Sequence, residues 1–86
     1  MPSILQQSYN VTKPITKSDT VDFPLVADRA LCDAIYVGGA GIVVAVKQDG
    51  TTDNFTAVAG EILPVQAKRV NSTTTTATLM VALYSV

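Results

Sequence analysis

The 86-residue sequence predicts a small all-β domain, an antiparallel β-sandwich or barrel of about five to seven short strands with an extended N-terminal arm. Two observations predict this fold. After residue 30, short runs rich in Val, Ile and Thr alternate with turn signals at a spacing of roughly ten residues, as in all-β domains. No segment there shows an apolar period of 3.6, and branched side chains favour pleated backbone.

Residues 1–30 form the predicted arm. Three of the four prolines lie in it, and proline interrupts the hydrogen-bonded ladder of a sheet. We therefore expect at most one edge strand here, near residues 9–12. The apolar residues Ile4, Leu5 and Tyr9 indicate packing on the chain's own sheet or on a neighbouring molecule, and a frayed terminus is the alternative.

Residues 31–86 form the predicted β domain. We expect its strands, in chain order, within residues 31–37, 42–47, 53–58, 62–70 and 75–84. The pair Asp49-Gly50 predicts a hairpin between the second and third of these runs, because glycine readily adopts the positive φ of such turns. The glycine-rich residues 38–41 predict a strand-to-strand turn. A phosphate loop would need a Lys-Ser/Thr pair and a following helix.

The alternation of side chains differs between the runs. Runs 42–47 and 75–84 are apolar on both faces, whereas an antiparallel strand with one wet face alternates apolar and polar residues. Such strands are covered on both faces, by a second layer or by another subunit, and five strands offer little material for two layers. We therefore expect another subunit. Run 62–70 alternates and contains Pro64, which favours an edge or half-exposed strand.

The composition also favours a homo-oligomer, with trimer and pentamer both open. A domain this small usually needs a disulfide, a metal or a partner chain, and it has one cysteine and no histidine. Charged residues make up 15% of the chain, against about 25% in typical domains. Part of the surface is therefore expected to be covered, the alternative being a monomer surface of neutral Thr, Ser and Asn.

Most functional classes have no support in the sequence. Without histidine there is no Ser-His-Asp or Cys-His triad, and Cys32 lies in an apolar run that predicts a buried, inert thiol. We expect no enzyme activity, no cofactor and no metal. A net charge of −1 argues against nucleic acid and anionic membranes. No apolar run could span a bilayer, and the absence of a signal peptide and of paired cysteines indicates assembly in a cytoplasm.

Tyrosines are the expected anchors of an interface, because tyrosine combines a large area with a polar tip. The alternative is that they cap the core of the monomer. The candidate interface residues are Ile4, Leu5, Tyr9, Tyr36, Met80 and Tyr84.

Several ordered motifs resemble one family. They are ITKSDT at residues 15–20, AIYVGGAG at 34–41, AVAGEILPV at 57–65 and KRV at 68–70, before a Thr-rich turn and an apolar last strand. This set resembles the head spike base proteins of tailed phages and of phage-like gene transfer agents. The resemblance covers about residues 15–84.

The resemblance implies a virion structural protein on the head exterior. Such a protein would be an oligomeric head spike base or capsid vertex/decoration protein assembled in the host cytoplasm. Its partners would be a capsid protein and, where the base carries a fibre, a fibre protein. The alternative is a carbohydrate- or receptor-binding β module of a phage fibre or tail. That module would need an exposed aromatic platform, yet aromatic residues are 6% of the chain and tryptophan is absent.

Overall fold

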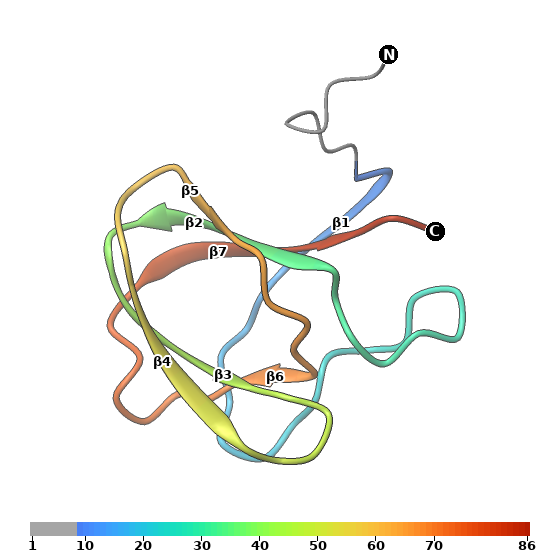
Figure 1. Cartoon of the computed structure of the whole chain (residues 1–86), viewed down its shortest axis with the longest axis horizontal. Coiled ribbons are helices and arrows are strands. Elements are labelled where there is room, and N and C mark those ends of the chain that lie inside the picture. The colour runs from blue at the N-terminus through green and yellow to red at the C-terminus, as the bar shows by residue number, and fades with distance from the viewer. Residues whose placement is uncertain (1–8) are drawn as a thin grey trace.

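The computed structural model describes residues 9–86, and these residues form two antiparallel sheets without a helix (Figure 1). The strands are β1 (Val11–Pro14), β2 (Ala34–Gly39), β3 (Gly41–Val46), β4 (Thr52–Ala57), β5 (Glu61–Leu63), β6 (Arg69–Val70) and β7 (Thr78–Tyr84). The first sheet has the order β1-β7-β2-β5 and the second the order β4-β3-β6. The predicted small all-β fold is confirmed.

The N-terminal segment is part of the domain from residue 9 onward. β1 pairs with β7 at the edge of the first sheet, two residues later in the chain than expected. The chain then follows the domain to residue 33. The Ile15 N–H donates to the Met80 carbonyl, the Ser18 N–H to Val70 and the Phe23 N–H to Lys68, over 2.8–2.9 Å. The described part of the arm thus packs on its own sheets, while Ile4 and Leu5 lie outside the described residues.

The expected strand at 62–70 is divided into β5 and β6, with Pro64 directly after β5. Its alternation persists nevertheless. Leu63, Val65 and Ala67 are buried, and Gln66 between them is exposed. Both short strands are edge strands, as the proline and the alternation indicate.

The glycine-rich residues 38–41 join the two sheets. β2 belongs to the first sheet and β3 to the second, so this expected turn is a corner between layers rather than a hairpin. The chain just before β7 passes very close to it. A Cβ atom added at Gly41 would lie 2.6 Å from the backbone nitrogen of Ala77. Glycine is required here because the two backbones approach so closely.

The hairpin predicted at Asp49-Gly50 is confirmed and connects β3 to β4. The Lys47 N–H donates to the Thr51 carbonyl at 2.9 Å, and the Gly50 N–H to the Lys47 carbonyl at 3.0 Å. Gly50 has φ 86°, which a residue without Cβ adopts at no steric cost.

Of the two strands with two apolar faces, β3 is covered by the chain itself, so the expectation that a second subunit covers it was wrong. β7 still exposes Leu79 on its outer side, and there the expectation stays a prediction. Val43, Val44, Ala45 and Val46 of β3 are all buried within one molecule. The missing material is the segment 15–33, whose Ile15, Phe23 and Val26 pack against the core. The composition still shows a shortage of charge, but the pattern of β3 no longer argues for an oligomer.

Candidate interaction surface

Four apolar side chains lie on the outer face of the first sheet, and we call them the outer apolar face: Tyr36, Ile62, Leu79 and Val81. Tyr36 of β2 lies between Ile62 of β5 and Val81 of β7 in the sheet register. Tyr36 is 37% exposed, Ile62 47% and Leu79 76%, while Val81 is half-buried. None is charged. Clustered apolar side chains that remain exposed are typical of an interaction surface.

Leu79 is held in an unusual backbone conformation. Its φ is 54°, and the pairing of β2 with β7 passes from Val37 and Met80 directly to Gly39 and Thr78. A left-handed conformation costs a non-glycine residue about 1–3 kcal/mol. Because the Leu79 side chain points into solvent, burial within the molecule does not offset that cost. Such strain is characteristic of binding sites, and no sequence pattern signals it.

Four of the six candidate interface residues lie within the described chain, and they form three groups by exposure. Tyr36 lies in the outer apolar face and Tyr9 is half-buried at the start of the described chain. Met80 and Tyr84, 5% and 1% exposed, belong to the core. For Tyr84 the alternative of a core residue is therefore correct. Both sets of side chains on β7 are apolar, so alternation alone could not show which set faces inward.

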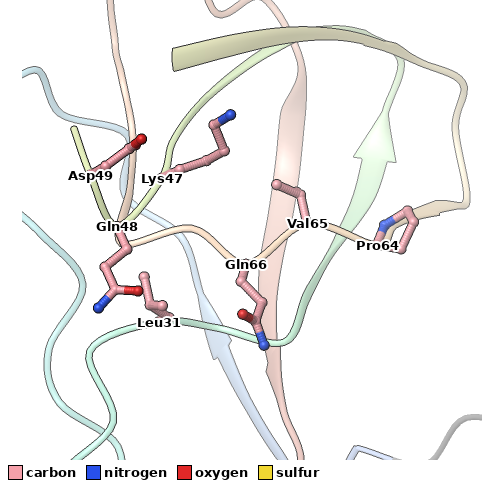
Figure 2. A pocket seen from close by; sticks show the side chains of 7 residues that line it. All are labelled: Leu31, Lys47, Gln48, Asp49, Pro64, Val65 and Gln66. Atoms are coloured by element: carbon pink, nitrogen blue, oxygen red, sulfur yellow. The ribbon is translucent and has the colours of Figure 1, made fainter. Parts of the chain in front are cut away.

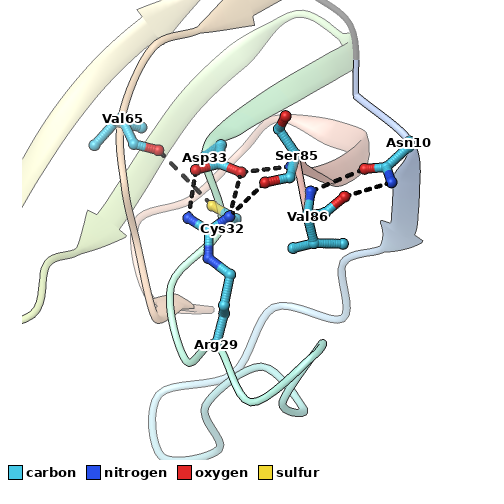
Figure 3. Close-up of polar contacts among 7 residues, drawn as sticks. All are labelled: Asn10, Arg29, Cys32, Asp33, Val65, Ser85 and Val86. Carbon is cyan, nitrogen blue, oxygen red and sulfur yellow. Dashed lines mark hydrogen bonds and ion pairs between the residues drawn. The ribbon is translucent and has the colours of Figure 1, made fainter.

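A polar clamp joins the start of β1, the start of β2 and the end of β7, which lie side by side at one end of the first sheet (Figure 3). The Arg29 guanidinium donates to the Asp33 carboxylate, at 2.9 Å from Nη1 to Oδ2, and to the Ser85 carbonyl at 2.8 Å. The Ser85 N–H donates to the same carboxylate. The guanidinium bonds and the Ser85 N–H hold the pKa of Asp33 below its usual range. Asn10 exchanges two hydrogen bonds with the Val86 backbone.

A hollow of about 530 Å³ lies beside the β3–β4 hairpin (Figure 2). Its charged groups are engaged within the hairpin. Lys47 forms an ion pair with Asp53 at 2.9 Å, and Asp49 accepts a hydrogen bond from the Thr51 hydroxyl at 2.6 Å. No aromatic side chain lines it, so it lacks the stacking platform of a sugar site. The lining residues are Leu31, Lys47, Gln48, Asp49, Pro64, Val65 and Gln66.

Cys32 is fully buried, as its apolar surroundings predicted. Its Sγ lies 3.7 Å from the Val65 carbonyl oxygen, and burial raises the pKa of the thiol. Among residues 9–86, no three His, Cys, Asp or Glu side chains are grouped as metal ligands would be. That same part of the chain contains no helix able to cross a membrane.

One solved structure decides the family. It is described as the capsid of a native GTA (gene transfer agent) particle computed with C5 symmetry, and one of its chains is 36% identical to this protein. The match covers 88% of this chain and 83% of that chain, with a TM-score of 0.77. The protein belongs to the family of that GTA capsid chain. No family model matches the sequence, and no curated protein does.

Membership of the GTA capsid family agrees with the sequence motifs. The resemblance to phage-like proteins is confirmed at the level of a capsid-related protein. The fold is shared over most of both chains.

Proposed function

We propose that the protein is a structural component of a phage-type particle. It acts as an oligomeric head spike base or capsid vertex/decoration protein, docks on the exterior of the capsid and provides a base for a fibre. The observation that carries the proposal is the 36% identity to a GTA capsid chain over 88% of this sequence. At that identity and coverage a shared structural role is the simplest inference.

The related particle was computed with fivefold symmetry, which supports a pentamer over a trimer. Capsids place fivefold axes at their vertices, and a ring of copies there would follow that axis. The composition agrees with assembly, because 15% charged residues leave much of the surface neutral. Assembly in the host cytoplasm and a position on the head exterior complete the proposal.

The outer apolar face is the surface that we assign to capsid docking. Leu79 is its most exposed member, and its strained backbone holds the side chain away from the core. Burial of a neutral apolar patch against another apolar surface is favourable, by about 25 cal/mol for each Å² of apolar surface removed from water. Docking would therefore place Leu79 and Tyr36 where solvent no longer reaches them.

The test uses particles from cells that produce a tagged copy of the chain. We expect the tag at the capsid vertices in electron micrographs, and a pentamer mass for the purified chain by light scattering. A chain that is absent from particles and has a mass of about 9 kDa at every concentration would contradict the proposal. Clear hits on a glycan array, with no particle incorporation, would instead favour the carbohydrate-binding module.

A further inference from the structure

Each of the two described sheets has two edge strands, β1 and β5 in the first sheet and β4 and β6 in the second. Of these four strands, β1 and β4 are long enough to pair with another strand. β5 has three residues and β6 has two. β4 has six residues, none of them proline or lysine, which are the residues that usually protect an edge, whereas β1 carries Lys13 and Pro14. Its open edge is therefore a template for a further strand.

The backbone groups of β4 that point outward can be identified from hydrogen bonds on β3. The backbone groups of Ile42 and Val44 on β3 point away from β4, toward β6. The Thr76 N–H donates to the Ile42 carbonyl, and the Asn71 N–H donates to the Val44 carbonyl. The intervening residue Val43 therefore bonds to β4, where it pairs with Phe55. It follows that Thr52, Asn54 and Thr56 direct their N–H and C=O groups outward.

The same reasoning applies to β1. The Ile15 N–H donates to the Met80 carbonyl, so alternate residues Val11 and Lys13 also bond to β7. Thr12 therefore directs its N–H and C=O groups outward. Pro14 offers only its carbonyl, since proline has no N–H. Residues 12 to 14 are all exposed.

The two open edges lie on opposite sides of the molecule, β1 at the upper right and β4 at the lower left of Figure 1. One copy therefore cannot join its own edges. A contact between different strands of two copies is head-to-tail. A head-to-tail contact repeats from copy to copy and forms a ring where the rotation closes, or an open filament where it does not.

We propose that β4 of one copy pairs antiparallel with β1 of the next copy, with Asn54 opposite Thr12. This register joins outward groups to outward groups and places Asp53 opposite Lys13 and Phe55 opposite Val11. The occupant of the β4 edge is thus a second copy of this chain. The inference rests on the proposed ring and names the contact that would build it.

The side chains support this register. Asp53 and Lys13 are the only charged residues of their strands, and they have opposite signs. Lys13 has no ion pair within residues 9–86, whereas Asp53 is half exposed beside Lys47. Both face the inner side of their sheets, since Asp53 pairs with buried Ala45 and Lys13 with buried Ala82.

Phe55 and Val11 provide the apolar part of the contact. Each is half-buried at the rim of its own core and shares the inner face with the charged pair. Placed opposite each other, they would cover one another and extend the core across the contact. Thr52 would lie opposite Pro14, where the Thr52 N–H donates to the Pro14 carbonyl. Proline has no N–H to donate back, so this pair makes one hydrogen bond.

Disulfide trapping tests the register in the purified full chain. In an antiparallel sheet, Asp53 and Lys13 would form a non-hydrogen-bonded pair with Cα atoms about 4.5 Å apart, within the range of a disulfide. The variant Lys13→Cys/Asp53→Cys should therefore give, on mild oxidation, a ladder of linked copies that ends at the ring size. Native Cys32 is fully buried and does not compete.

The matched control is Thr12→Cys/Asp53→Cys, which moves one thiol to the opposite face of the sheet. We expect no ladder from it. Equal ladders from the two variants would overturn the inference, as would unlinked Lys13→Cys/Asp53→Cys protein in samples whose light-scattering mass shows assembly. The latter result would leave the proposed particle role intact, because an assembled chain would then use another contact.

A proline substitution gives a second, independent measurement. Asn54→Pro removes an N–H that points away from β3, so the internal ladder remains and the thermal midpoint should change little. The mass of the purified protein should fall to that of one copy. The control Asn54→Ala keeps the N–H and should stay assembled. A fully assembled Asn54→Pro protein would overturn the inference.

Discussion

Leu79 stands over Gly38, so closely that a Cβ atom added to the glycine would lie 2.8 Å from the leucine Cβ. We expect Gly38→Ala to lower the free energy of unfolding by about 1–3 kcal/mol, as overpacking does in cores. Urea unfolding measures the change. In a Leu79→Gly background the cost of Gly38→Ala should be smaller, because the Cβ contact is gone. Equal costs in both backgrounds would show that this contact is not limiting.

Leu79→Gly should separate docking from folding. Glycine adopts the φ of 54° without strain, and the lost side chain is 76% exposed, so the unfolding free energy of the free chain should not fall by more than about 1 kcal/mol. Incorporation into particles should fall about tenfold, if Leu79 anchors the docked face. Quantitative blotting of purified particles gives the incorporation.

The control is Val58→Gly, which removes a similarly exposed apolar side chain, 65% exposed, from the loop between β4 and β5, outside the outer apolar face. It should leave incorporation unchanged. Normal incorporation of the Leu79→Gly protein would remove the docking role from this face.

Truncation to alanine should lower the unfolding free energy much more at Tyr84 than at Tyr36. Tyr84 is 1% exposed, so Tyr84→Ala should cost about 3–5 kcal/mol of unfolding free energy. Tyr36 is 37% exposed, and Tyr36→Ala should cost the free chain far less while weakening docking. Denaturant midpoints of the two variants check this order. A larger loss of stability for Tyr36→Ala would contradict the placement of these residues.

The Arg29–Asp33 clamp should make stability depend on acid. The pKa of Asp33 is lowered in the folded state, first by the Arg29 guanidinium and then, against the effect of burial, by the Ser85 N–H. A carboxylate whose pKa is lower in the folded state than in the unfolded state stabilises the fold. This stabilisation is fully present above the pKa of the unfolded state, about 4, and is lost as the pH falls through the pKa of the folded state.

Thermal midpoints measured from pH 6 to pH 2.5 should therefore fall, and less steeply for Asp33→Asn than for the unmodified chain. Asp28→Asn provides the control, because that exposed carboxylate forms no hydrogen bond or ion pair among the described residues. Identical slopes for the unmodified and Asp33→Asn proteins would exclude the clamp as a source of the acid sensitivity.

Local patterns in the sequence predict the strands well. The Asp49-Gly50 hairpin and the alternation around Val65 follow from the two-residue period and from turn chemistry, which neighbouring residues determine. The packing of the arm on the two sheets could not be predicted from local sequence patterns. Ile15 and Phe23 lie in a segment without a period, and only long-range bonds to Met80 and Lys68 show that it closes the core.

The candidate surface was predicted only in part. Tyr36, chosen by residue type, is exposed, whereas Met80 and Tyr84 are buried, because β7 is apolar on both sides and its sequence does not show which side faces inward. Leu79 had no signal at all, since its exposure depends on a left-handed backbone conformation opposite Gly38 that only the structure reveals. Sequence alternation shows which side chains share a face, and the second sheet determines which face is inside.

The position of β7 between β1 and β2 has a consequence for synthesis on the ribosome. β1 leaves the exit tunnel early, yet its pairing partner is the last strand of the chain. Until that strand emerges, Val11 and Ile15 have nothing to pair with, and β2 also lacks its central neighbour. Closing the sheet is therefore a late, non-local event, and nascent chains crowded on one messenger would be open to mispairing with each other.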